Sequence, residues 1–446
     1  MKYKLLIIIM LFTPLLAVSQ VEQQEPDPFQ EDPFFTKPLK DWFSTDVIIE
    51  RVSRRSIRAF KGEGLDSGTR DITGFSENPG LSSINLMYPA VRFNRVEALY
   101  LGFHSDRYLD WGRSSYRDIN PYGSIGYSFG RKTWLYTIGI ERMFGMNGNF
   151  LLGASHSRIT DSEDQWRVGW VENSLISFFS VHDFMDYYAR NGTQIYSVAR
   201  PSRYVELSVG YTDDRYTSLD KQSGFSVFGK GRDVRHNPLI DEGKIQLLKT
   251  AFQFNAADRM LTERFGMSLD VDAEFSDVIS NNSDYEYRRV QLENRTIFVV
   301  DPSAVLQNRI RVVSVTGDAP GFKYVPLGGI STMRATPFKS MMGSHVVLVN
   351  TELQMGFDFG SASFNDEIII DATQLKFSLF ADMGWTNKSI SSSNKIMDGF
   401  QDFKVGDFTT DVGFGVNFSA MKIEAAWRSN DLTSRPMIWV RFNPTF

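Results

Sequence analysis

Several segments of this chain alternate apolar and polar side chains with a period of two. In the clearest one, residues 265–275, apolar side chains occupy every odd position, and small or acidic ones occupy the even positions. A period of two places successive side chains on opposite faces of a β-strand. The pattern recurs within 121–130 and 203–213, and less cleanly within 133–143. We therefore expect an all-β protein, and the open question is what its apolar face contacts.

Composition narrows the answer. Beyond the first twenty positions there is no run of about 18 apolar residues, which a membrane-spanning helix would need. Mean hydropathy is −0.24, yet 14% of residues are aromatic, with 36 Phe and 17 Tyr. Many aromatics with little continuous hydrophobicity are typical of a transmembrane β-barrel, whose apolar face contacts lipid. A secreted soluble β-protein remains the alternative, because periodicity alone does not separate the two.

The C-terminal sequence favours the barrel. In "PMIWVRFNPTF", Ile438, Val440, Phe442 and Phe446 share one parity, and the chain stops on an aromatic residue. This resembles the last strand of outer-membrane barrels, where a terminal Phe serves as the insertion signal. The resemblance implies that Phe442 and Phe446 form such a signal. It also implies a location in the outer membrane of a Gram-negative bacterium, in contact with outer-membrane lipids and lipopolysaccharide.

Three domains are expected along the chain. Residues 1–20 have Lys2 and Lys4 before a short apolar run, which predicts a signal peptide; an anchor helix is the alternative. With no cysteine, the chain has neither disulfides nor a Cys-linked lipid anchor. Residues 21–88 are first acidic and proline-rich, then basic, which predicts an extended periplasmic segment. Its basic part either rests at the barrel mouth or is solvated. Residues 89–446 form the predicted barrel.

We locate about fifteen strands in the barrel region. Since bacterial single-chain barrels usually have an even number, we expect about sixteen, the missing one lying at 80–88 or 165–171. Residues 171–192 predict a short amphipathic helix in a connection, either anchored in the membrane face or packed on the barrel rim. The predicted strands are 91–103, 121–130, 133–143, 149–158, 192–200, 203–213, 243–256, 263–276, 286–299, 305–316, 344–357, 374–385, 408–418, 420–428 and 436–446.

A glycine-rich loop carries a single arginine. Arg334 lies in "LGGISTMRAT", residues 327–336. On the strands that follow, parity sends Glu352 and Asp382 to the polar face, which would line the barrel interior. A guanidinium binds a carboxylate through two parallel hydrogen bonds, which suits pinning a flexible loop to a wall. Breaking such a pair from one side would cost roughly 3–5 kcal/mol if it is buried.

These motifs, in this order, resemble the BamA/TamA superfamily of outer-membrane assembly barrels. The resemblance implies a sixteen-stranded barrel whose extracellular loop folds inward, its arginine meeting an aspartate in an F-x-D-x-G strand. At the loop tip Ala335 and Thr336 replace the usual glycine and aromatic residue. Residues 21–88 are too short and too rich in Pro and Gly for the POTRA modules of well-known members. The matching positions are Leu327, Gly328, Gly329 and Arg334 in the loop, and Phe380, Asp382 and Gly384 in the strand.

Two functions follow from the resemblance. One is the assembly or translocation of outer-membrane proteins through a lateral seam between the first and last strands, where a client strand adds to a free edge. The other is an accessory or structural barrel, or a narrow pore in a complex. Few hydrogen bonds between residues near 93–103 and 436–446 would favour the first. Partners would be outer-membrane client proteins, or periplasmic and lipoprotein partners.

An enzyme is not expected. No GxSxG or HExxH motif occurs, and the histidines show no convergent pattern. We expect no cofactor and no metal site. A net charge of −5 gives no basic field for nucleic acid. The five histidines are His104, His156, His182, His236 and His345.

Overall fold

The computed structural model describes most of the predicted barrel region. The predicted signal peptide, nearly all of the predicted periplasmic segment and Phe446 lie outside the described residues, so those predictions stay predictions. The described residues are 87–105, 119–145, 150–202, 204–229, 232–254, 264–276, 278, 282–301, 303–356, 362–364, 368–370, 375–387, 395–401, 403–418 and 421–442.

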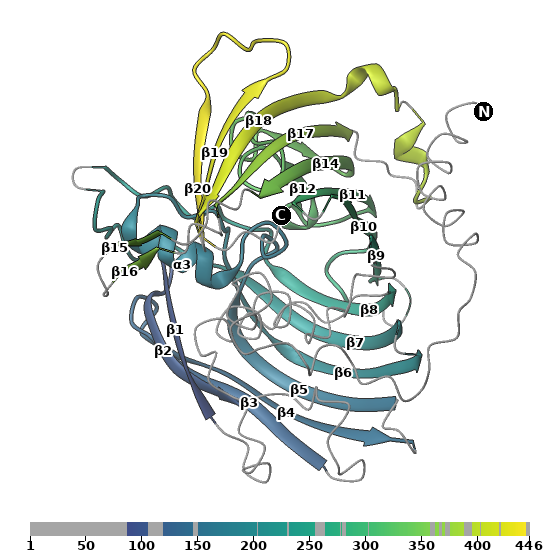
Figure 1. Cartoon of the computed structure of the whole chain (residues 1–446). Helices are drawn as coiled ribbons and strands as arrows, with labels where there is room; N and C mark the ends of the chain where they lie inside the picture. Colours follow the sequence, from purple (N-terminus) through teal and green to yellow (C-terminus); the bar gives the residue numbers. More distant parts are fainter. Residues whose placement is uncertain are drawn as a thin grey trace, which may run out of the picture. The chain divides into compact units, whose positions relative to one another are not determined.

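A single antiparallel sheet of sixteen strands dominates the structure, and the strands follow one another in sequence order (Figure 1). Each inner strand of this sheet pairs with the sheet's preceding and following strands along the chain, and β1 and β20 each pair with one neighbour. The strands are β1 (Met87–Asn94), β2 (Ala98–Ser105), β3 (Ile119–Ser128), β4 (Thr133–Phe144), β5 (Phe150–Asp161), β6 (Tyr188–Ser202), β7 (Val205–Ser218), β8 (Gly243–Phe254), β9 (Phe265–Phe275), β10 (Tyr287–Asp301), β11 (Ala304–Gly317), β14 (His345–Gly356), β17 (Leu375–Asn387), β18 (Thr409–Phe418), β19 (Met421–Arg428) and β20 (Met437–Phe442).

The predicted all-β, sixteen-stranded barrel fold is thus confirmed, with the sheet open between its two terminal strands. β1 and β20 are the edges, and among the described residues no ladder joins them. The smaller elements are β12 (Val325–Leu327) paired with β13 (Met341–Gly343), β15 (Ala362–Phe364) paired with β16 (Ile368–Ile370), helix α3 (Trp170–Phe179), and the 3-10 turns η3 (Gly321–Lys323), η5 (Asp398–Phe400) and η6 (Val405–Asp407).

The strand missing from the sequence count lies inside the first predicted strand. Residues 91–103 contain a tight turn, Arg95–Glu97, that separates β1 from β2. The Asn94 side chain stabilises this turn by accepting from the main-chain N–H of Val96 at 3.0 Å and of Glu97 at 2.7 Å. Of the two positions proposed for the missing strand, 165–171 was wrong, because these residues form a turn and the start of α3. In the other, 80–88, residues 87–88 belong to β1, and residues 80–86 lie outside the described residues.

The two faces of the sheet have opposite chemistry. One face is exposed and apolar, with Ile138 at 68%, Trp134 at 59% and Ile195 at 59% of full exposure. The other face is buried and polar or charged, including Thr137, Gln194 and Arg309. A water-soluble sheet buries its apolar face instead. An apolar outside around a polar inside is the pattern of a transmembrane barrel.

The connections at the two ends of the strands differ in length. The end that holds the β1–β2 turn also carries the long connections 162–187, 219–242 and 318–344. The predicted helix at 171–192 is correct in kind but ends early: α3 stops at Phe179, and β6 begins at Tyr188. No helix in the described part of the chain has the length and hydrophobicity needed to cross a membrane.

Candidate functional site

Arg334 lies against the buried polar face of the sheet and binds Asp382 on β17. Its Nε donates to Asp382 Oδ2 at 2.8 Å, and its Nη2 donates to Oδ1 at 2.7 Å. The main-chain N–H of Arg334 also donates to Oδ2, at 3.2 Å. Both side chains are almost fully buried, at 2% and 0% exposure. This is the bidentate geometry that fixes both the position and the orientation of a guanidinium.

Two further carboxylates complete the cluster. Arg334 Nη1 donates to Glu424 Oε1 on β19 at 2.6 Å and to Glu352 Oε2 on β14 at 3.1 Å. Lys422 Nζ, also buried, contacts both glutamates, at 2.6 Å to Glu352 and 2.9 Å to Glu424. We call Arg334, Asp382, Glu352, Glu424 and Lys422 the clasp. Burial opposes the charge of Arg334, but Asp382 and Glu424 outweigh it and hold its pKa well above the ordinary value.

The motif residues around the clasp permit close approach of loop and wall. The Arg334 guanidinium lies over the Phe380 ring, with 3.4 Å between Cζ and the ring centroid, which is a cation–π contact. A Cβ on Gly384 would lie 2.8 Å from Met333 Sδ and 3.0 Å from Leu327 Cδ1. The F-x-D-x-G strand thus presents to one loop the Phe380 ring, the Asp382 carboxylate and, at Gly384, a backbone without a side chain.

The start of the loop depends on two glycines with positive φ. Gly328 has φ +110° and Gly329 has φ +84°. A Cβ on Gly328 would also lie 2.1 Å from the Pro337 carbonyl oxygen. Only glycine adopts such backbone angles without strain, so the pair sets the path by which the loop folds back on itself. Leu327, which precedes the pair, is fully buried.

The loop tip, where the sequence departs from the BamA/TamA pattern, has a wall contact of its own. The main-chain N–H of Ala335 donates to Asp411 Oδ2 on β18 at 2.8 Å, and Thr336 Oγ1 contacts the same oxygen at 3.0 Å. Asp411 is fully buried. Together with Asp382 and Glu424, it links the tip to three consecutive strands, β17, β18 and β19.

The last strand also reaches the loop. Trp439 Nε1 on β20 donates to the Arg334 main-chain carbonyl at 2.7 Å. A side chain on the open edge strand is therefore hydrogen-bonded to the main chain of a clasp residue. This contact gives the loop a physical connection to the opening between β1 and β20.

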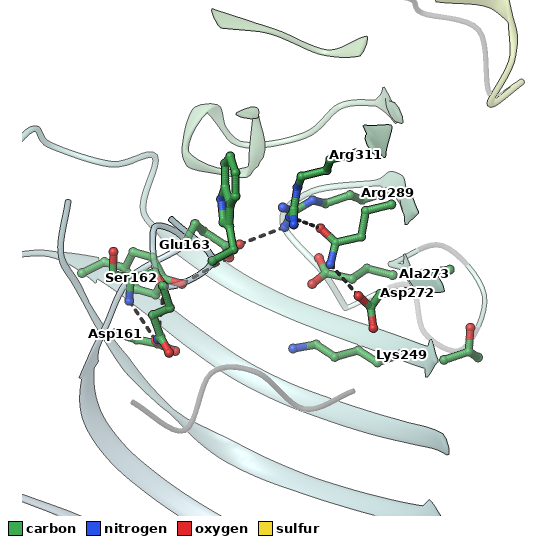
Figure 2. Close-up of a pocket in the computed structure, with 14 residues that line it drawn as sticks. Asp161, Ser162, Glu163, Lys249, Asp272, Ala273, Arg289 and Arg311 are labelled. Atoms are coloured by element: carbon green, nitrogen blue, oxygen red, sulfur yellow. Dashed lines mark hydrogen bonds and ion pairs between the residues drawn. The ribbon is translucent and has the colours of Figure 1, made fainter. Parts of the chain in front are cut away.

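A second charged cluster pins the connection between β5 and β6 (Figure 2). Glu163 accepts from Arg289 Nη1 at 2.8 Å, and Figure 2 labels both residues. It also accepts from Lys323 Nζ at 2.6 Å. Burial alone would raise the pKa of Glu163, but these two cations hold it well below its usual range. Arg311 lies over the Trp166 ring at 4.2 Å. The cluster borders a small cavity of about 60 Å³, whose charged lining includes Lys249 and Asp272.

The two inward connections are tied to each other. We call residues 328–340, which connect β12 to β13 and carry Arg334, the clasp loop. Within it, Lys339 donates to Asp164 at 2.6 Å and to Asp186 at 2.5 Å. Arg167 donates to the Pro326 carbonyl. Burial would raise the pKa of Asp186, but Lys339 and Arg235 outweigh it and lower the pKa to about 2. The clasp loop and the β5–β6 connection therefore form one interlocked unit.

Part of the clasp was predicted from the sequence, and the rest was not. The structure brings together Arg334, Asp382 and Glu352, and places Phe380 and Gly384 beside them. Glu424, Asp411 and Lys422 were missed. A signal for two of them existed: in "MKIEAAW" Lys422 and Glu424 alternate with Met421 and Ile423, the same parity that had identified Asp382. Phe442 is half-buried at the end of β20, and its role in insertion stays a prediction.

Within the described ranges, no group of three or more His, Asp or Glu side chains is arranged to hold a metal ion.

No protein-family model matches the chain, and no curated protein matches it in sequence. Solved structures that it resembles include BamA from Haemophilus ducreyi lacking POTRA domains 1–3, with TM-score 0.48 and 11% identity over 79% of this chain and 68% of that one. CdiB from Acinetobacter baumannii gives TM-score 0.38 and 12% identity over 77% and 55% of the two chains. CdiB from Escherichia coli gives 0.40 and 10% over 87% and 72%.

The features that the sequence resemblance implied occur together in this structure. Sixteen antiparallel strands, an inward loop that opens with "LGG", and an arginine bound to the aspartate of an F-x-D-x-G strand are all present. The chain therefore has the BamA/TamA-like barrel fold that its motifs predict.

Proposed function

We propose that this protein is an outer-membrane barrel that assembles or translocates other outer-membrane proteins through the opening between β1 and β20. The outer-membrane location is supported by the apolar exposed face of the sheet, which water would not stabilise. Membrane lipid and lipopolysaccharide would cover that face. The proposed role needs no catalytic residue, metal or cofactor.

The open seam carries this proposal. β1 and β20 pair only with β2 and β19, so within the described residues each has one edge free of strand partners. A free edge presents main-chain N–H and C=O groups to an incoming strand, and β-augmentation satisfies those groups on both chains. A closed accessory barrel would instead join its first and last strands by a regular ladder. A lack of hydrogen bonds between residues near 93–103 and 436–446 is the feature expected above for an assembly barrel.

The clasp gives this seam a defined frame. It joins the loop to β14, β17 and β19, and the Trp439 indole extends the connection to β20. We assign the clasp a structural role: it keeps the polar interior filled and fixes the strands that lead to the seam. It keeps the β20 edge in place for an incoming strand and takes no part in a chemical reaction.

An accessory or structural role remains the second candidate, and depletion separates the two. The protein would be depleted in the source bacterium, and the abundance of every outer-membrane barrel would be measured by quantitative mass spectrometry. General loss of barrel proteins, restored by expressing the wild-type chain, is the result expected of an assembly barrel. Loss confined to one or a few proteins would contradict general assembly and favour the accessory role.

A further inference from the structure

Helix α3 lies between the two free edges of the sheet and contacts both (Figure 1). On the β1 side, Ser174 Oγ accepts from the main-chain N–H of Phe93 at 3.2 Å. On the β20 side, Glu172 Oε1 accepts from the main-chain N–H of Phe442 at 3.3 Å. These two amides would otherwise be offered to a neighbouring strand. One helix therefore satisfies an edge group on each side of the opening.

A buried ion pair fixes α3 to β20. Glu172 accepts from Arg441 Nε at 3.1 Å and from Arg441 Nη2 at 3.2 Å. Both side chains are buried, at 6% and 1% exposure. The guanidinium thus binds both oxygens of one carboxylate. This bidentate geometry strengthens the interaction and also fixes the relative position of the two side chains. This ion pair attaches α3 to the last strand, although the two residues are 269 positions apart in the sequence.

The outward face of α3 is apolar, unlike that of a helix on the surface of a water-soluble protein. Its exposed stripe consists of Leu175, Phe178 and Phe179, which are 38%, 38% and 39% exposed. Its buried face combines apolar Trp170 and Ile176 with polar side chains. Among the polar ones, Asn173 Nδ2 donates to Asp183 at 3.0 Å and to Tyr187 at 2.7 Å. An apolar outward face, with hydrogen-bonded polar groups turned inward, suits a helix whose outer surface is in lipid.

The stripe continues into the apolar outer face of the barrel. Phe93, which shares the outward parity of exposed Val91, has its ring 5.4 Å from that of Phe178. A second segment adds to the surface: the main-chain N–H groups of Val227 and Phe228 donate to the carbonyls of Phe178 and Phe179, each at 2.9 Å. The resulting seam patch consists of Leu175, Phe178, Phe179, Phe225, Val227 and Phe228, all exposed.

We propose that α3 and the adjoining segment 225–228 complete the barrel wall across the opening between β1 and β20, with the seam patch in contact with lipid acyl chains. This inference rests on the proposed outer-membrane location. It has a mechanical consequence for the seam: a strand that adds to either edge must first displace Glu172 or Ser174. The opening is thus covered at rest and becomes available when α3 moves.

The absence of native cysteine makes a spin-label test direct. Leu175→Cys and Phe179→Cys, each carrying a nitroxide, would be reconstituted in phosphatidylcholine vesicles, and collision rates with oxygen and with a water-soluble nickel chelate would be compared. Ile138→Cys on β4 is the lipid-facing control, and Lys404→Cys, exposed in a connection, is the solvent control. We expect both α3 labels to favour oxygen several-fold over the nickel chelate, as Ile138→Cys does.

The controls separate the possible failures. If Ile138→Cys favours oxygen but both α3 labels behave like Lys404→Cys, the seam patch faces water or another protein, and the inference is overturned. If Ile138→Cys itself behaves like Lys404→Cys, the membrane location fails, and the proposed function fails with it.

Amide exchange tests the covering of the edge independently. In Glu172→Ala, main-chain exchange around Phe442 should accelerate several-fold relative to wild type, because the edge amide loses its acceptor. Glu206→Ala is the matched control, since Glu206 on β7 pairs with Arg200 on β6 at 2.7 Å, on inner strands of the sheet and not on its edges. Equal protection of the β20 segment in wild type and both variants would show that α3 does not cover the edge.

Discussion

Replacing Arg334 with alanine tests the clasp most severely. The guanidinium donates to three buried carboxylates, those of Asp382, Glu352 and Glu424. After its removal Lys422 still contacts Glu352 and Glu424. Asp382 loses its bidentate partner and retains the Asn350 side-chain amide, which donates at 2.7 Å, and the main-chain N–H of residue 334, which donates at 3.2 Å. The damage therefore concentrates on Asp382.

The size of the effect follows from this asymmetry. Removing one member of a buried ion pair costs about 3–5 kcal/mol, because the remaining charge is buried without compensation. We expect Arg334→Ala to lower the free energy of unfolding by about that amount. Asp382→Ala combined with Arg334→Ala should be less destabilising than the sum of the two single variants, by about 0.5–3 kcal/mol, since the second change removes the uncompensated charge.

Urea unfolding in detergent micelles and limited proteolysis measure the two consequences, stability and loop order. Arg435→Ala is the matched control, because Arg435 is exposed in a connection. The expected result is a lower unfolding midpoint and faster cleavage within residues 328–340 for Arg334→Ala alone. If Arg334→Ala and Arg435→Ala gave the same midpoint and the same cleavage rate, the clasp would not hold the loop.

Three further changes test separate contacts. Gly384→Ala should destabilise the fold by about 1–3 kcal/mol through overpacking, whereas Gly406→Ala, whose added Cβ meets nothing within 4 Å, should not; equal unfolding midpoints would refute the close approach. Asp186 has a pKa lowered to about 2, so its contribution is present above the ordinary pKa near 4 and is lost as pH falls toward 2; Asp186→Asn should flatten the decline in unfolding free energy across that window, and an unchanged slope would contradict this. Glu163→Gln leaves Lys323 and Arg289 without their shared carboxylate, so the free energy of unfolding should fall by about 3 kcal/mol; an unchanged free energy of unfolding would mean that the second cluster stabilises nothing.

The sheet could be predicted from the sequence because the alternation of apolar and polar side chains is a property of each strand by itself. Alternation assigns each side chain to a face without any knowledge of neighbouring strands, and it placed Asp382 and Glu352 correctly on the polar face. It failed at 91–103 because the turn Arg95–Glu97 has no Gly or Pro to mark it. The turn is stabilised instead by Asn94 and by Arg95, whose Nη2 donates to Asp186 at 2.9 Å.

Long-range contacts explain what sequence analysis missed. Glu424 is 90 positions from Arg334, and Glu172 is 269 positions from Arg441. No spacing rule joins residues so far apart, and only the order of strands in the sheet brings them together. The helix at 170–179 was predicted as amphipathic, but which face would be buried depends on the seam, a feature that exists only in the folded sheet.

Photo-crosslinking from the β1 edge during synthesis of outer-membrane proteins tests whether client strands add at the opening between β1 and β20. A photoreactive residue would replace Val91 on β1, and the same residue at Ile138 on β4 would serve as the control, since both side chains are exposed on the apolar face. We predict that newly made barrel proteins crosslink to position 91 and do not crosslink to position 138. Crosslinks from position 91 that stay within the chain under all conditions, with no client captured, would contradict it.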